Sequence, residues 1–320
     1  MDLFACIGGF STGATHAGHT IVLAVDCDPV ALSIHAENHP NCRHVEMLLG
    51  PETEDDLVRL IREIVPEGTP WHLHGSPPCT KLSRARCMAR QPGDAFDAEG
   101  IRIGAQEGAD LVQWYLNFTK RMCPSSWSME QVNAKLVRDL CNEQKKQYPA
   151  WFDYQVVEFL NFGVPQSRIR LIAGMPWMIE RLRFDNSMRV CELVAIRDVL
   201  TPPEGAVYIR NCWARPAING LTEEGINGEF LNEDAESRCR TFDKVSWTVM
   251  ASSNLQWWDR QYQRVRNLRI PEIMALQTFP ASYSFPEGVR VSDQLRGVGN
   301  AVPPLFARKF MGRYRVGPLV

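Results

Sequence analysis

The chain has 320 residues, of which 45% are apolar and 22% charged, and it carries a net charge of −2. This length and composition are typical of a globular protein with one large domain or two smaller ones. No stretch approaches the about 20 consecutive apolar residues of a membrane span, and residues 1–4 lack the basic region of a signal peptide. We therefore expect a soluble, intracellular protein without a membrane partner.

Short apolar runs alternate with segments of helical periodicity through the first half of the chain. We predict strands at residues 3–4, 21–25, 71–74, 127–129, 154–159 and 170–175. We predict helices at residues 11–18, 57–65, 111–122 and 134–147. Strands that alternate with helices indicate an α/β fold with a doubly wound, mostly parallel sheet.

A second, smaller domain is predicted where this alternation breaks. Residues 177–246 fall into short, irregular pieces rich in Asn, Gly, Glu and Pro, and closely spaced apolar residues return from about residue 291. We therefore assign residues 1–176 and 291–320 to a first domain. Residues 177–290 form the second domain and its hinge.

The ten cysteines show no C-x-x-C spacing, which argues against zinc ribbons and redox pairs. We expect reduced thiols and no bound metal. Basic residues gather in two segments without acids, residues 81–90 and 260–269. Each segment is compatible with a solvated face or with contacts to nucleic acid.

The most informative segment is Gly-Ser-Pro-Pro-Cys at residues 75–79, directly after a predicted strand. Each proline fixes its own φ, and Pro78 also pushes Pro77 toward extended geometry, so Cys79 is held on a stiff backbone. Such positioning suits a thiolate nucleophile at the carboxyl edge of a sheet. A buried, inert cysteine fits this turn equally well.

A glycine-rich turn, DLFACIGG at residues 2–9, ends the first predicted strand, and Asp26 follows about 20 residues later. This arrangement favours a nucleoside over the sheet edge with Asp26 on its ribose hydroxyls, and a purely structural turn has the same pattern. The glycines do not fit G-x-G-x-x-G, and no G-x-x-x-x-G-K-[ST] is present. NAD, FAD and a P-loop are therefore disfavoured.

Seven segments carry a resemblance to a known family. In chain order they are residues 2–9, Asp26, and residues 75–83, 127–132, 163–170, 266–280 and 299–304. Together they resemble the cytosine-5 DNA methyltransferase family over nearly the whole chain. The resemblance implies a Rossmann-like methyltransferase fold in which the second domain recognises the target. It also implies S-adenosyl-L-methionine as cofactor, S-adenosyl-L-homocysteine as product, and double-stranded DNA as the partner of a monomer.

The resemblance assigns catalytic roles to four residues. Cys79 is expected to add to carbon 6 of cytosine, and Glu130 to place a proton at ring nitrogen 3. Arg170 is expected to hold ring oxygen 2, and Arg168 to support the cysteine turn or a phosphate. The target base has to leave the duplex to reach these groups.

The resemblance also implies contacts to cofactor and DNA. The residues expected to contact the cofactor are Phe4, Ala5, Cys6, Ile7, Gly8, Gly9, Asp26, Cys27, Glu46, Met47, Pro78, Leu111, Asn300, Ala301 and Val302. The residues expected to contact DNA are Lys81, Ser83, Arg84, Arg86, Gln166, Arg210, Arg215 and Arg240. The loop that begins at Lys81 is expected to close over the DNA and to grip phosphates.

Four residues depart from the family's usual pattern. Cys6 replaces a glycine and crowds the cofactor loop, and Cys27 replaces an aromatic or apolar neighbour of adenine. Thr80 replaces the glutamine that commonly follows the nucleophile. Gln131 replaces an asparagine, and its extra methylene is expected to shift the proline-cysteine turn that it supports.

Two alternatives remain open. The tRNA-methylating branch of the family shares the catalytic motifs, but its Cys-Phe-Thr insertion is absent from this sequence, which favours DNA. A non-catalytic DNA-binding relative is the second alternative. The presence of Cys79, Glu130, Arg168 and Arg170 argues against it, because binding alone needs no thiol nucleophile.

Overall fold

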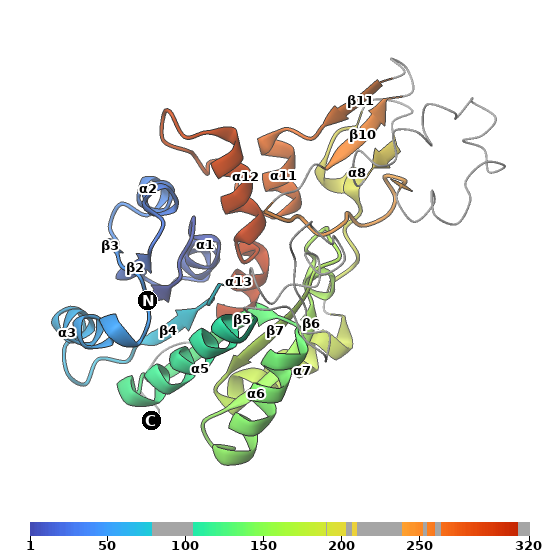
Figure 1. The fold of residues 1–320 in the computed structure, drawn as a ribbon. Coiled ribbons are helices and arrows are strands. Elements are labelled where there is room, and N and C mark those ends of the chain that lie inside the picture. Colours follow the sequence, from blue (N-terminus) through green and yellow to red (C-terminus); the bar gives the residue numbers. More distant parts are fainter. Residues whose placement is uncertain are drawn as a thin grey trace.

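The structure, a computed structural model, describes residues 1–78, 105–189, 191–202, 207–209, 239–251, 255–259 and 264–312. Its centre is a seven-stranded sheet in the order β3-β2-β1-β4-β5-β7-β6 (Figure 1). The strands are β1 (Asp2–Leu3), β2 (Leu23–Asp26), β3 (Arg43–Glu46), β4 (His72–Gly75), β5 (Ser126–Val132), β6 (Asp153–Glu158) and β7 (Ile169–Gly174). The pairings are parallel except those of β7, which runs antiparallel to β5 and β6. The predicted doubly wound, mostly parallel sheet is confirmed.

Helices cover both faces of this sheet. One buried cluster joins the strands to α3 (Glu54–Ile64), α5 (Ala105–Met122) and α6 (Lys135–Gln147). A second cluster holds α1 (Gly9–His16), α7 (Pro176–Met188) and α13 (Pro304–Met311). Leu171 and Ala173 belong to the first cluster and Ile172 to the second. Because side chains alternate along a strand, the two clusters lie on opposite faces.

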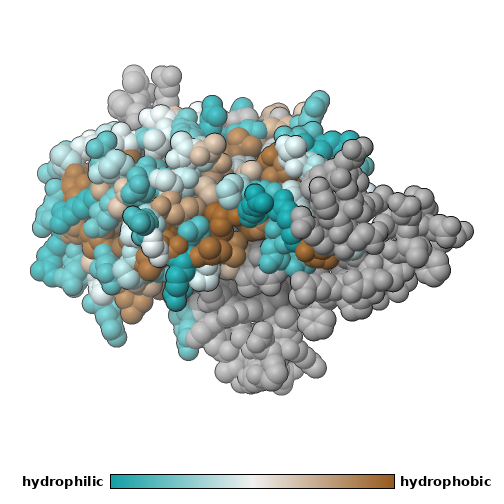
Figure 2. Space-filling view, turned by 90° about the horizontal axis from the view of Figure 1, so that it is seen from above, coloured by the Kyte–Doolittle hydropathy of each residue, from teal (hydrophilic) through white to brown (hydrophobic). Residues whose placement is uncertain are grey.

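Further helices and turns connect these layers. They are α2 (Pro29–Asn38), α8 (Ile196–Val199), α11 (Ile270–Leu276), α12 (Val291–Asn300) and the 3-10 turns η1 (Pro51–Thr53) and η2 (Phe159–Phe162). No helix of the described ranges is both long and apolar enough to span a membrane. Seen from above, hydrophilic side chains cover much of the molecule, and apolar ones gather toward the middle of the view (Figure 2).

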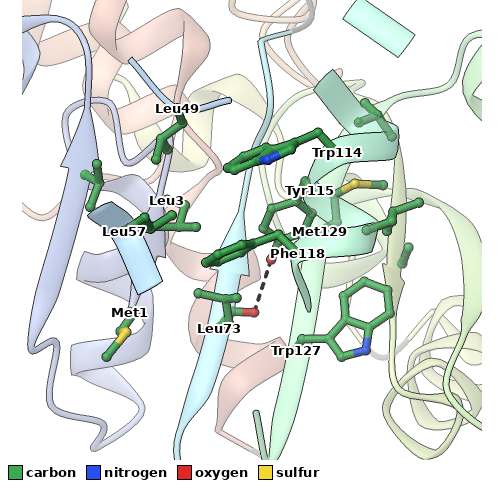
Figure 3. Close-up of a cluster of buried hydrophobic side chains, with 14 of the residues drawn as sticks. Met1, Leu3, Leu49, Leu57, Leu73, Trp114, Tyr115, Phe118, Trp127 and Met129 are labelled. Carbon is green, nitrogen blue, oxygen red and sulfur yellow. Dashed lines mark hydrogen bonds between the residues drawn. The ribbon is translucent and has the colours of Figure 1, made fainter. Parts of the chain in front are cut away.

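Aromatic side chains of α5 lie against the central strands (Figure 3). The Tyr115 hydroxyl lies 2.9 Å from the Ser128 carbonyl and 3.3 Å from the Leu73 carbonyl, and so it ties β5 to β4. A Cβ at Gly75 would lie 2.3 Å from the Tyr115 ring, so only glycine fits there. The last residue of β4 is thereby held just before the Pro-Pro-Cys turn.

Several elements were not predicted from the sequence, among them β3, α2 and α7. The strand β3 is short and polar and lies at the edge of the sheet, so it lacks an apolar run. The helix α2 has almost no amphipathic pattern, because it is buried on several sides. The expectation of irregular structure from residue 177 is wrong for α7, whose Met178 and Leu182 pack with Phe306. The boundary at residue 176 stays a prediction.

A small antiparallel sheet lies apart from the central one, beyond α11 in Figure 1. Its order is β11-β10-β8-β9, and its strands are β8 (Val207–Ile209), β9 (Cys239–Arg240), β10 (Gln256–Asp259) and β11 (Arg264–Asn267). The Arg266 guanidinium lies 3.8 Å from the centre of the buried Trp257 ring and pairs with Glu272 at 2.8 Å. These contacts connect the small sheet to the start of α11.

Two histidines of β4 are buried inside the main domain. His72 contacts the hydroxyls of Ser126 and Ser128, and His74 contacts those of Ser128 and Ser76, at 2.8–3.1 Å. Desolvation by burial holds the pKa of both imidazoles well below 6.5. Both rings are therefore neutral in the folded protein at mildly acidic pH.

These histidines predict a pH dependence of stability. Below the unfolded pKa of about 6.5 the unfolded chain binds protons that the folded His74 does not, so the free energy of unfolding falls as the pH falls. Replacing His74 with Gln should reduce this slope by about 1.4 kcal/mol per pH unit below pH 6.5. Guanidinium unfolding of both proteins from pH 7.5 to 5.5 measures the difference. Parallel curves would show that the folded His74 is protonated in this range.

Candidate active site

Loops that follow four parallel strands meet at one edge of the central sheet. The register pairs Leu3 with Val25 and Gly75, and Asp26 with Glu46. The carboxyl ends of β1, β2, β3 and β4 therefore share this edge, where ligands of such sheets bind. The predicted cofactor loop and the turn before Cys79 lie together there.

The loop after β1 has a constrained backbone. Phe4 and Cys6 have φ of 56° and 48°, a region that costs residues other than glycine about 1–2 kcal/mol. Cys6, which stands where the family uses glycine, adopts the positive φ that glycine adopts without strain. The Asp26 carboxylate accepts hydrogen bonds from the backbone N–H of Cys6 at 2.8 Å and of Asp28 at 2.9 Å. Asp26 therefore braces the loop, and desolvation raises its pKa.

The segment after α12 packs directly on this loop. A Cβ at Gly9 would lie 2.2 Å from the Val302 carbonyl oxygen and 2.9 Å from the Ala301 Cβ. Ala301 and Val302 are buried, whereas Asn300 is exposed. The Tyr283 hydroxyl donates a hydrogen bond to the Ile7 carbonyl. Sequence reasoning missed Tyr283, because no local pattern links it to residue 7.

The other residues predicted for the cofactor differ in exposure. Cys27, Glu46 and Pro78 are exposed at the sheet edge. Phe4, Met47 and Leu111 are partly buried and pack against the first core cluster. The apolar side chains of this group therefore continue the core to the edge where Asp26 lies.

The backbone before Cys79 is held from β5. Gln131 is fully buried, and its side-chain amide donates to the Pro77 carbonyl at 3.0 Å. Its side-chain oxygen accepts from the Val132 N–H at 2.7 Å. Gln131 thus makes the bond that supports the turn, although its side chain is one methylene longer than that of asparagine.

Glu130 and Arg170 form an ion pair beside this turn. Arg170 Nε lies 2.9 Å from Glu130 Oε1, and the two side chains are 16% and 10% exposed. Glu130 pairs with Ile172, and Arg170 pairs with Val132. Residues two apart on a strand share a face, so the antiparallel pairing brings the two charged groups together.

Two predicted site residues, Arg168 and Gln166, are buried. Arg168 is 2% exposed, and its guanidinium donates to the carbonyls of Val249 at 2.8 Å and Gly299 at 3.2 Å. It joins the main domain to the segment after α12 rather than a phosphate. Gln166 is fully buried and contacts the Leu276 carbonyl at 2.9 Å. The expected DNA contact of Gln166 stays a prediction, and its side chain is enclosed in this structure.

The DNA contacts predicted elsewhere are described only at Arg240. Its guanidinium lies 3.6 Å from the centre of the Trp247 ring and donates to the Val245 carbonyl at 2.8 Å. A hollow lined by Leu193, Asp243, Lys244 and Trp247 lies beside it, away from Glu130. Outside the described residues lie Cys79, Thr80, Lys81, Ser83, Arg84, Arg86, Arg210 and Arg215.

Comparison with known families agrees with this arrangement. The family described as C-5 cytosine-specific DNA methylase matches residues 1–174 and 210–314. The chain belongs to this family. The C-5 methylases modify carbon 5 of cytosine in DNA, so the predicted function as a DNA cytosine-5 methyltransferase is confirmed at this level.

Individual relatives are similar over much of the chain. A type II methyltransferase, M1.HphI of Haemophilus parahaemolyticus, is 25% identical over 96% of this chain and 84% of its own length. M.XorII of Xanthomonas oryzae pv. oryzae is 30% identical over 54% of this chain and 39% of its own length. The crystal structure of a protein described as a prophage-encoded DNA modification methyltransferase (E. coli) has a TM-score of 0.60 at 19% identity, covering 97% of this chain and 96% of that one. That likeness shows the shared fold.

Substitutions at Gln131 should lower the free energy of unfolding of this C-5 methylase. Replacing Gln131 with Leu leaves the buried Pro77 carbonyl and Val132 N–H without their partners, at about 1–3 kcal/mol for each group. Replacing it with Asn keeps an amide but removes a methylene, so the loss should be about 1 kcal/mol. Guanidinium unfolding measures both, with Gln113→Leu on α5 as control. An equal loss for Leu and Asn would contradict this role.

Proposed function

We propose that this chain transfers a methyl group from S-adenosyl-L-methionine to carbon 5 of a flipped cytosine in duplex DNA, with Cys79 as the transient nucleophile. The observation that carries the proposal is the ion pair between Glu130 and Arg170 beside the Pro77 turn. The acid Glu130, the cation Arg170 that can hold the cytosine, and the rigid turn that leads to Cys79 would then lie close together. Cytosine-5 chemistry needs these three groups.

The residues at the sheet edge fit the cofactor. A carboxylate has about four acceptor positions, and the N–H groups of Cys6 and Asp28 occupy two of those of Asp26. The others suit the two hydroxyls of a ribose. Phe4 and Met47 offer apolar surface to the cofactor. Ala301 and Val302 pack against Gly9 of the loop. The cofactor supplies an electrophilic methyl group on a sulfonium.

The chain's own residues activate the cytosine. The Cys79 thiolate forms a bond to carbon 6, and the ring electrons move toward nitrogen 3. Glu130 places a proton at nitrogen 3, where negative charge develops, and Arg170 holds oxygen 2. Carbon 5 is then nucleophilic. After methylation a base removes the carbon-5 proton, the bond between sulfur and carbon 6 breaks to release the thiolate, and the proton at nitrogen 3 returns to Glu130.

DNA binding is proposed to depend on basic residues of the segment after Cys79 and of the second predicted domain. Cytosine inside a duplex presents neither carbon 6 nor nitrogen 3 to the protein, so the base has to be extruded at a cost of a few kcal/mol. Lys81, Arg84, Arg86, Arg210 and Arg215 are proposed to contact phosphates or base edges, and Arg240 lies on the small sheet. The small sheet is proposed to read a short target.

One experiment tests substrate and reaction together. The protein is incubated with labelled S-adenosyl-L-methionine and either plasmid DNA or tRNA, and the DNA is then sequenced for 5-methylcytosine. We expect label in DNA, at cytosines of one short sequence. Label in tRNA alone would favour the tRNA-methylating alternative. The absence of transfer to both, by a protein that still binds DNA, would favour the non-catalytic alternative.

A further inference from the structure

A cluster of metal-binding side chains lies between α2 and β3, outside the residues assigned to catalysis. His35, Cys42 and His44 each offer one ligand atom, and these atoms lie within 4.8 Å of one another. His35 and Cys42 are buried, and His44 is partly buried. Cys42 comes just before β3 and His44 lies within it, and the ligand atoms of both are close to that of His35 on α2. Among the described residues this is the one group with such a donor set.

Hydrogen bonds orient the ring of His35 toward this cluster. The Ser11 hydroxyl donates to Asp2 Oδ2 at 2.7 Å, and it lies 3.0 Å from His35 Nε2. A hydroxyl that donates its one proton to a carboxylate can only accept from the imidazole. With Asp2 ionised, the proton of His35 is therefore on Nε2, and its Nδ1 accepts a hydrogen bond from His44 Nε2–H at 2.8 Å. A carboxylate that orients a ligand histidine through its far nitrogen is the usual support of a metal site.

The thiol of Cys42 completes the donor set. Its one described hydrogen bond is a long one, 3.4 Å from Sγ to the carbonyl of the adjacent Arg43. Zn–N distances of about 2.0–2.1 Å and a Zn–S distance of about 2.3 Å put tetrahedral ligand atoms about 3.3–3.7 Å apart. The histidine nitrogens would separate slightly and the thiol would move inward.

We propose that His35 Nδ1, His44 Nε2 and Cys42 Sγ bind a divalent transition metal, with zinc as the best match and water as the fourth ligand. Two imidazoles and a thiolate favour zinc over Mg²⁺ or Ca²⁺, which prefer oxygen ligands. On binding, the Cys42 thiol loses its proton to solvent, and the proton of His44 moves from Nε2 to Nδ1. This proposal replaces the expectation of a metal-free protein, which rested on the missing C-x-x-C spacing.

The site would stabilise the cofactor end of the main domain. A Cβ at Gly8 would lie 2.7 Å from His35 Cδ2, so this ring packs against the cofactor loop. Ser11, which holds the ring, lies on α1 directly after that loop. A metal between α2 and β3 therefore ties the loop, α1 and the edge strand together. The role is structural, and the metal takes no part in methyl transfer.

Metal titration of the full chain tests the proposal without an activity assay. The protein is stripped with a chelator and titrated with Zn²⁺ alone against a chromogenic chelator, and then with Co²⁺. We expect about one tight equivalent per chain, and a thiolate-to-cobalt charge-transfer band. Cys42→Ser and His44→Gln should bind at least about tenfold more weakly and lack that band. Cys141→Ser, another buried cysteine, and His16→Gln, an exposed histidine, are the matched controls.

Thermal unfolding separates loss of metal from loss of fold. With chelator present, the wild-type chain and the Cys42→Ser variant should have similar circular dichroism spectra. Zn²⁺ should then raise the melting temperature of the wild type and of the two control variants, but not that of Cys42→Ser or His44→Gln. Tight binding that persists in Cys42→Ser, or a wild type without any tight equivalent, overturns the proposal.

Discussion

Replacing Cys79 with Ser should lower methyl transfer to DNA by about 10⁴-fold or more. A cysteine is a few per cent thiolate near neutral pH, whereas a serine hydroxyl is not ionised there and is a poor nucleophile without a base. The hydrogen bond from Gln131 to the Pro77 carbonyl fixes the turn that leads to residue 79. The C–O bond of serine is shorter than the C–S bond of cysteine, and this turn cannot shift to bring the serine oxygen closer to carbon 6. Transfer of labelled methyl groups from S-adenosyl-L-methionine measures the loss.

A trapping assay gives the same prediction a second readout. Fluorine at carbon 5 of the target cytosine replaces the proton that must leave, so the bond from sulfur to carbon 6 cannot be broken by elimination. The wild type should become covalently attached to such DNA, and the Cys79→Ser variant should not. Cys123→Ser, an exposed cysteine after α5, is the control and should behave as the wild type. An adduct that forms with Cys79→Ser would show that another residue is the nucleophile.

Replacing Glu130 with Gln should lower kcat by about 10²–10⁴-fold, with little change in the affinity for DNA. The amide keeps the shape of the side chain but cannot supply the acidic proton at nitrogen 3. It also leaves Arg170, which is 16% exposed, without its charge partner at 2.9 Å. The rate of adduct formation on fluorinated DNA should fall in parallel, because the addition step itself is slowed.

Two comparisons make the result at Glu130 specific. Glu143→Gln, on the exposed side of α6, should leave kcat unchanged. A double-mutant cycle of Glu130→Gln with Arg170→Gln should give a non-additive effect, since the two side chains are in contact. Full kcat in Glu130→Gln would remove this residue from the chemistry. Additive effects would mean that the ion pair has no part in catalysis.

Two buried side chains, Arg168 and Gln166, connect the segment just before β7 to distant backbone segments. Arg168 donates to backbone carbonyls of residues 249 and 299, and Gln166 accepts from the Val249 N–H at 2.9 Å. Gln277 extends the same network to the carbonyls of Val298 and Ala301. This network holds the segment after α12 against the cofactor loop. We therefore expect its residues to position the site.

The sequence by itself determined the class of fold and the chemistry at the sheet edge. Period-two and helical patterns predicted six of the strands and the helices between them, because those segments bury continuous apolar faces. The order of the short motifs predicted the loop at residues 4–9, the acid Asp26 and the turn before Cys79, since the function of each depends on local backbone geometry. The polar edge strand β3 and the helix α2 gave no such signal.

Only the tertiary structure decided which side chains face one another. The pairing of Glu130 with Arg170 follows from the antiparallel register of β5 and β7, and the bond from Gln131 to Pro77 joins residues 54 positions apart. The burial of Gln166 and the meeting of His35 with His44 likewise depend on how distant elements pack. The physical reason is common to all four. A local pattern specifies the conformation of a segment, whereas register and packing between segments bring polar groups within bonding distance.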